Sequence, residues 1–245
     1  MTLLEGLILI VGGAAAGFIN ALAGGGSAIT IPILTELVGI NTANGTNRIA
    51  IFLANLTAIA GYQKGEVVPW RRLSVLIIPT VIGAAVGAWV STVTPPDVLR
   101  MVFAAVLLLV AASVVLRPSR WLEEREIALH EPWRSIVFLG IGFYGGFVQA
   151  GVGFILLAGL VLGAGMNLVN GNAAKVVLIA AYSPIAILLF AQASQVDLAV
   201  GGVLAVGQMS GAWAGSRLAV LKGAAWIRWV LVAAAVVAAA RLAFG

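Results

Sequence analysis

The sequence predicts an all-α, polytopic membrane protein built from two homologous helical repeats. Of its 245 residues, 62% are hydrophobic and only 9% are charged, and the mean hydropathy is +1.10. A soluble domain carries about 25% charged residues, so this chain lacks the polar side chains that a water-facing surface needs. Two similar, glycine-broken stretches also occur about 127 residues apart. Membrane transporters often place a mid-membrane site between two such interrupted segments.

Eight apolar segments approach the length of about 20 residues that crosses a hydrocarbon core. They cover residues 4–23, 43–62, 73–93, 98–116, 134–150, 171–191, 198–220 and 225–244. Two shorter apolar segments, 27–39 and 153–164, each follow a glycine cluster. We expect these to be half-helices, re-entrant segments or short tilted crossings. The predicted organisation is a first repeat at 1–116, a polar linker at 117–133 and a second repeat at 134–245.

The distribution of positive charge bears on how the repeats are oriented. If each short segment completes a return crossing, one face of the membrane collects ten basic residues: Lys64, Arg71, Arg72, Arg117, Arg120, Arg125, Arg134, Arg217, Lys222 and Arg228. If each short segment only continues the preceding span, the same residues divide seven to three. Because cytoplasmic loops are enriched in Lys and Arg, we favour inverted repeats with both termini outside. A GAxxG pattern in each repeat, at 83–87 and 211–215, predicts close helix packing.

Each repeat contains a glycine-broken stretch that a carboxamide side chain precedes. The residues are Asn20, Gly24, Gly25, Gly26 and Ser27 in the first repeat, and Gln149, Gly151 and Gly153 in the second, where Gln149 stands in the place of Asn20. Non-helical backbone at membrane depth is tolerated only inside protein or beside a water-filled cavity. The helix that follows would point its positive end into the break and attract anions, with Ser27 as its cap. The alternative is that the glycines only permit close helix crossing.

A second paired motif places a cation in a membrane helix of each repeat. Asn44-Gly45-Thr46-Asn47-Arg48 corresponds to Asn170-Gly171-Asn172 followed by Lys175, and each motif opens a long apolar helix. Charges within the membrane are costly and by default functional. No acidic residue is duplicated near both cations, so we expect their partner to be a dissolved anion, with Thr46, Asn47, Asn170 and Asn172 completing the site. The alternative is that each cation snorkels to a nearby interface.

The residues that several other functions require are missing. There is no cysteine, and the single histidine, His130, lies in the polar linker. An intramembrane enzyme with a Ser–His or metal mechanism is therefore not expected, and no Walker motif indicates ATP hydrolysis. We expect neither a metal nor a cofactor. No basic run with interleaved aromatic residues suggests nucleic acid, so the expected partners are a small anionic substrate and the lipid bilayer. A homodimer is one assembly that we consider.

The motifs from Gly17 to Pro32, from Asn44 to Arg48 and from Gly146 to Lys175 resemble those of the TauE/SafE family of membrane permeases, also called the toluene-sulfonate uptake permease family. The resemblance covers nearly the whole chain, and the second copy of the Asn-Gly motif is the looser match. It implies transport of sulfite or organic sulfonates across the bacterial plasma membrane. The predicted function is therefore a secondary transporter that exports such an anion through a site between the repeats. The alternatives are an anion channel of the same architecture and a carrier of another small organic acid.

Overall fold

The computed structural model describes residues 1–102, 104–105 and 129–244, and every regular element in that part of the chain is helical. In chain order the elements are α1 (Leu3–Leu22), α2 (Ser27–Val38), α3 (Ile40–Gln63), α4 (Trp70–Thr92), α6 (Trp133–Phe147), α7 (Val152–Ala158) with its π-helical continuation η2 (Gly159–Gly163), α8 (Leu168–Gln192) and α9 (Leu198–Phe244). Helix α9 is kinked at Gly223, where φ is 69°. The predicted all-α fold is confirmed.

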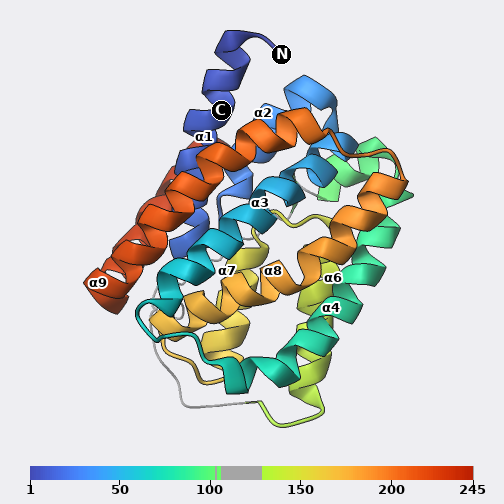
Figure 1. Ribbon diagram of the computed structural model, residues 1–245. Coiled ribbons are helices and arrows are strands. Elements are labelled where there is room, and N and C mark those ends of the chain that lie inside the picture. The colour runs from blue at the N-terminus through green and yellow to red at the C-terminus, as the bar shows by residue number, and fades with distance from the viewer. Residues whose placement is uncertain (103, 106–128, 245) are drawn as a thin grey trace.

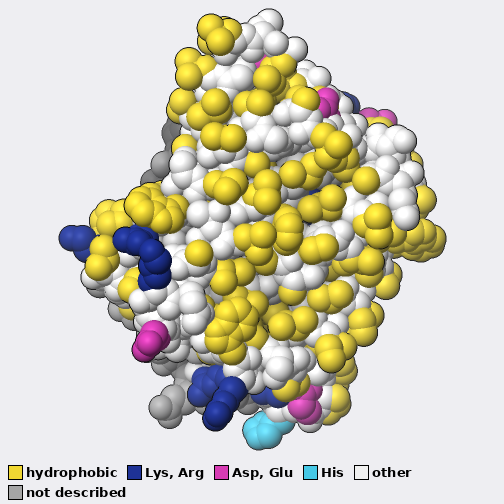
Figure 2. Space-filling model, in the orientation of Figure 1, with side chains coloured by type: hydrophobic (Ala, Val, Ile, Leu, Met, Phe, Trp, Pro, Cys, Tyr) yellow, Lys and Arg dark blue, Asp and Glu magenta, His cyan; other side chains and the backbone are white. Residues whose placement is uncertain are grey.

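Four of the described helices are long and apolar enough to cross a membrane: α1, α4, α8 and the Leu198–Ala224 part of α9. Figure 2 shows a face with hydrophobic side chains over its middle and most of the charged side chains near its edge. This arrangement suits a surface that faces lipid between two polar layers. Most of the predicted span 98–116 and of the linker 117–133 lies outside the described residues, so the number of crossings and the domain boundaries stay predictions.

The two short apolar segments form the short helices α2 and α7–η2, as half-helices would. The long helices that follow begin earlier than predicted, α3 at Ile40 and α8 at Leu168, so both Asn-Gly motifs lie within the first turns of a helix. The predicted cap at Ser27 is wrong, because Gly26 occupies the cap position and α2 has no side-chain cap. The amino end of α8 is capped instead by Asn167, whose side chain accepts from the backbone N–H of Asn170.

Helices α3 and α8 pack together in the middle of the molecule, with α9 and α1 on one side and α4 and α6 on the other (Figure 1). Each outer pair joins a helix of one half to a helix of the other. A Cβ at Gly83 of α4 would lie 2.0 Å from the Leu139 carbonyl oxygen of α6. One at Gly211 of α9 would lie 1.9 Å from the Ala14 oxygen of α1. The GAxxG segments thus serve close helix packing, as predicted.

Candidate functional site

The two glycine breaks meet each other inside the protein. A Cβ added at Gly24 would lie 2.3 Å from the Cα of Gly153, and one added at Gly153 would lie 2.3 Å from the Cα of Gly24. Real side chains do not approach a backbone so closely, so only glycine fits at both positions. Gly24 also has a φ of +94°, which side chains other than glycine rarely adopt. The glycines therefore do permit a close crossing, and the crossing joins the two breaks.

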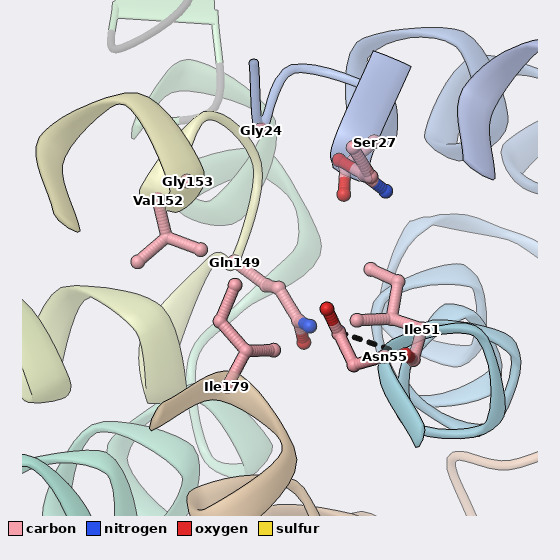
Figure 3. A pocket seen from close by; sticks show the side chains of 9 residues that line it. Gly24, Ser27, Ile51, Asn55, Gln149, Val152, Gly153 and Ile179 are labelled. Atoms are coloured by element: carbon pink, nitrogen blue, oxygen red, sulfur yellow. Dashed lines mark hydrogen bonds between the residues drawn. The ribbon is translucent and has the colours of Figure 1, made fainter. Parts of the chain in front are cut away.

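A pocket lies beside this glycine contact (Figure 3). Its lining consists of Asn20, Gly24, Ser27, Ile51, Asn55, Gln149, Val152, Gly153 and Ile179. Five of these residues were predicted from the sequence: Asn20, Gly24, Ser27, Gln149 and Gly153. The polar lining residues are carboxamides and a hydroxyl, and none is a carboxylate. The structure therefore brings the two halves together around a small pocket that has four polar side chains in an otherwise apolar lining.

Asn55 is the polar lining residue that sequence reasoning missed. It lies on α3, two helical turns after Arg48 and on the same side of the helix, and only 6% of its surface is exposed. Its side-chain N–H donates to the carbonyl of Ile51 at 2.8 Å, which directs its oxygen away from its own helix. The spacing of two helical turns from Arg48 is the sequence signal that could have identified Asn55. A buried asparagine in an apolar helix without a counterpart in the second repeat did not otherwise stand out.

Gln149 is the polar group of the pocket with no partner. Only 2% of its surface is exposed, and neither its side-chain nitrogen nor its side-chain oxygen has a hydrogen-bond partner in the structure. A buried polar group left unpaired costs about 1–3 kcal/mol. In Figure 3 its carboxamide points towards Asn55 across the pocket. Such a costly, unpaired group beside a pocket indicates a binding site more than a packing role.

Arg48 is completely buried and holds the carboxyl end of α6. Its Nη1 donates to the Gly145 carbonyl at 3.0 Å, and its Nη2 donates to the Gly146 carbonyl and to the Asn44 side-chain oxygen. The guanidinium carbon also lies 4.5 Å from the centre of the Phe190 ring. The last carbonyls of a helix lack partners within the helix and carry the negative end of its dipole, so they attract a cation.

Lys175 makes the reciprocal contact with the carboxyl end of α1. Its Nζ donates to the Asn20 carbonyl at 2.8 Å, to the Ala21 carbonyl at 3.3 Å and to the side-chain oxygen of Asn172. It too is completely buried, so snorkelling is wrong for both cations. Neither forms a salt bridge within the described residues. Helix carbonyls therefore partner both cations in the structure, and the dissolved anion expected beside them stays a prediction.

These reciprocal contacts change which residues correspond between the halves. The cations bind the carbonyls of Asn20 and Gly145, which are 125 residues apart, whereas the sequence motifs aligned Asn20 with Gln149. Gln149 corresponds instead to Gly24. Both have positive φ, of 63° and 94°, and both donate their N–H to the carbonyl five residues earlier. The prediction that Gln149 occupies the place of Asn20 is therefore wrong by about one helical turn.

The other predicted site residues lie outside the pocket lining. Asn47 donates to the Ser27 hydroxyl at 3.4 Å and accepts from Thr30 at 2.9 Å, which ties α3 to α2. Thr46 accepts from the backbone N–H of Asp197 at 2.9 Å, just before α9. The predicted residues that do not line the pocket are Gly25, Gly26, Thr46, Asn47, Arg48, Gly151, Asn170, Asn172 and Lys175. In the described ranges, no group of three histidine, aspartate or glutamate side chains is placed to hold a metal.

Comparison with known proteins gives one consistent result. The sequence model of the family described as "Sulfite exporter TauE/SafE" matches residues 9–242. The chain is 31% identical over 232 residues to "Probable membrane transporter protein YfcA" of Escherichia coli K12, covering 94% of this chain and 86% of that protein. It is 30% identical over 241 residues to "Probable membrane transporter protein ORF9" of Sinorhizobium sp, covering 96% and 90%. No solved structure matches significantly. The chain therefore belongs to the TauE/SafE family and is an integral membrane transporter rather than an enzyme.

Proposed function

We propose that the protein is a secondary transporter that exports a small sulfur-containing anion, sulfite or an organosulfonate, and that the pocket where the two breaks meet binds it. The description of the matching family names sulfite export. The proposal rests mainly on the positive charge around the pocket. Its polar lining is uncharged, and two fully buried cations lie one helical turn away, Arg48 from Ile51 on α3 and Lys175 from Ile179 on α8.

The cations favour an anion without needing to touch it. At an effective dielectric constant of about 20, a unit cation attracts a unit anion ~8 Å away by about 2 kcal/mol. The helix carbonyls that hold Arg48 and Lys175 offset part of this attraction. Direct contacts come from the lining, namely the side chains of Asn20, Ser27, Asn55 and Gln149. Exposure of the pocket to alternate sides would come from movement of one repeat against the other.

The test is sulfite counterflow in proteoliposomes that contain the purified protein. Gln149→Leu removes the unpaired carboxamide, and Gln192→Leu, at the exposed end of α8, is the matched control. A hydrogen bond to a charged group contributes about 1.5–3 kcal/mol, so we expect the Gln149 variant to lose at least about tenfold in counterflow while the control keeps it. If a well-folded Gln149→Leu protein shows counterflow at the wild-type rate, this pocket is not the anion-binding site. Saturable counterflow indicates a carrier, whereas a voltage-driven current without counterflow indicates the channel alternative.

A further inference from the structure

The orientation of each polar group in the pocket follows from the hydrogen bonds that it already makes. The Asn20 side-chain oxygen accepts from the Gly26 N–H at 2.8 Å, which leaves its NH₂ group to donate. The Ser27 hydroxyl oxygen accepts from Asn47 at 3.4 Å, which leaves its O–H to donate. The first break thus contributes two donors to the pocket, as an anion requires.

The opposite wall contributes acceptors. Asn55 donates one N–H of its NH₂ group to the Ile51 carbonyl, and no donor among the described residues bonds its oxygen. Gln149 carries one donor group and one acceptor oxygen, both unpaired and buried. Gln149 faces Asn55 in Figure 3, so its NH₂ group can donate to the Asn55 oxygen. The Gln149 oxygen has no donor in the structure, and a bound anion that takes the donors of Asn20 and Ser27 leaves it so.

An unsatisfied acceptor discriminates between anions. The oxygens of a fully deprotonated anion only accept, so they repel the oxygen of Asn55 or Gln149 and leave it unpaired. An anion that carries an O–H group donates to that oxygen while its charged oxygens accept from Asn20 and Ser27. We propose that this pocket selects monoanions that bear an O–H donor, such as hydrogensulfite or a hydroxylated sulfonate, over anions without one. This inference rests on the proposed function, whose substrate class it narrows.

The sharpest probe is a pair of sulfonates with the same charge at every working pH. 2-Hydroxyethanesulfonate carries an O–H, and ethanesulfonate does not. Apparent dissociation constants for both are measured from ligand-induced thermal stabilisation of the purified transporter. We expect 2-hydroxyethanesulfonate to bind about tenfold more tightly, because the analogue that lacks the O–H leaves a buried acceptor unpaired. Equal affinities of the wild-type protein for the two sulfonates overturn the inference.

The variant Asn55→Leu tests whether the Asn55 oxygen causes the preference for 2-hydroxyethanesulfonate. Asn55→Leu removes the acceptor and frees Gln149 to donate to the anion, so the tenfold preference is expected to fall below about threefold. Thr57→Val is the matched control, because Thr57 lies on the same helix and bonds only the Leu53 carbonyl of its own helix. A folded Asn55→Leu protein that keeps the full preference overturns the role of Asn55. Since the wild-type comparison needs no variant, misfolding of Asn55→Leu leaves the test intact.

Glycolate and acetate, a second pair that differs by an O–H group, separate the two proposals. Preference for 2-hydroxyethanesulfonate together with sulfite counterflow supports both. Sulfite counterflow without any preference within either pair refutes the inference and keeps the proposed function. Tight binding of glycolate over acetate, without binding of any sulfur anion, supports selection for an O–H donor and refutes the sulfur-containing substrate.

Discussion

The contact between Gly24 and Gly153 predicts how alanine substitutions lower the stability of the protein. The loss has two physical parts, steric overlap of the added Cβ and strain of the backbone. Gly24→Ala adds a Cβ 2.3 Å from the Gly153 Cα and also forces a side-chain-bearing residue into a φ of +94°. Gly153→Ala adds only the overlap, because Gly153 does not have positive φ. Gly39→Ala adds only the strain, because Gly39 has a φ of +75° and a Cβ there meets nothing within 4 Å.

The magnitudes follow from these two parts. A strained backbone conformation costs about 1–3 kcal/mol, and overpacking costs about 1–3 kcal/mol. Replacing glycine by alanine recovers about 0.4–1 kcal/mol through the unfolded chain. We therefore expect losses in the free energy of unfolding of about 1 kcal/mol each for Gly39→Ala and Gly153→Ala, and about 3 kcal/mol for Gly24→Ala.

Unfolding by SDS titration in mixed micelles measures all three variants against the wild-type protein. The decisive comparison is between Gly24→Ala and Gly39→Ala, which share the strain and differ in the overlap. If the two variants lose the same stability, the breaks do not touch, and the pocket beside them loses its structural basis. If Gly153→Ala is as stable as the wild-type protein, the same conclusion follows from the other side of the contact.

Three further predictions concern the cations, the packing and a residue outside the pocket. Arg48→Lys keeps the buried charge and is expected to retain more sulfite counterflow than Arg48→Met, which should lose at least about tenfold; equal counterflow by both would show that the charge is dispensable. Gly83→Leu places its Cβ 2.0 Å from a carbonyl oxygen of α6 and should lower the yield of monodisperse protein. The control Gly140→Leu meets no atom within 4 Å of its Cβ and should keep the wild-type yield. Similar yields of the two variants would contradict the α4–α6 contact. Thr46→Val loses its bond to the Asp197 N–H and should cost about 1 kcal/mol in SDS unfolding without changing the KM for sulfite; a tenfold rise in KM would instead make Thr46 a ligand.

Much of the fold was predictable because a bilayer restricts what a sequence can do. Long apolar segments become helices, and glycine clusters interrupt them. The sequence therefore predicted the breaks at Gly24 and Gly153 and the short helices that follow them. It also predicted that Arg48 and Lys175 are not at lipid-facing surfaces. These features depend on side-chain type and spacing alone.

What the sequence did not reveal depends on the backbone and on contacts between the halves. The partners of Arg48 and Lys175 are carbonyl groups, which every residue has and which leave no pattern in a sequence. The correspondence of Asn20 with Gln149 was displaced by four residues, because Gly17-Phe18 and Gly146-Phe147 match in the displaced register and a shift of four keeps the same face of a helix. Asn55 has Tyr182 at the equivalent place in the second repeat, so no internal pairing marked it.

The charge of the site, taken with the two helix ends, favours an anion as the ligand of the proposed site. The carboxyl end of a helix carries about half a negative charge. Each buried cation is bound to one such end, Arg48 to that of α6 and Lys175 to that of α1, so each leaves roughly half a positive charge uncompensated. Two halves give about one positive charge near a pocket whose own polar lining is uncharged, and the amino end of α2, whose first residue Ser27 lines the pocket, adds partial positive charge. An anion balances this surplus. Under the proposed function, the charge of the site favours an anion, and the unpaired oxygen of Gln149 favours one that carries an O–H donor.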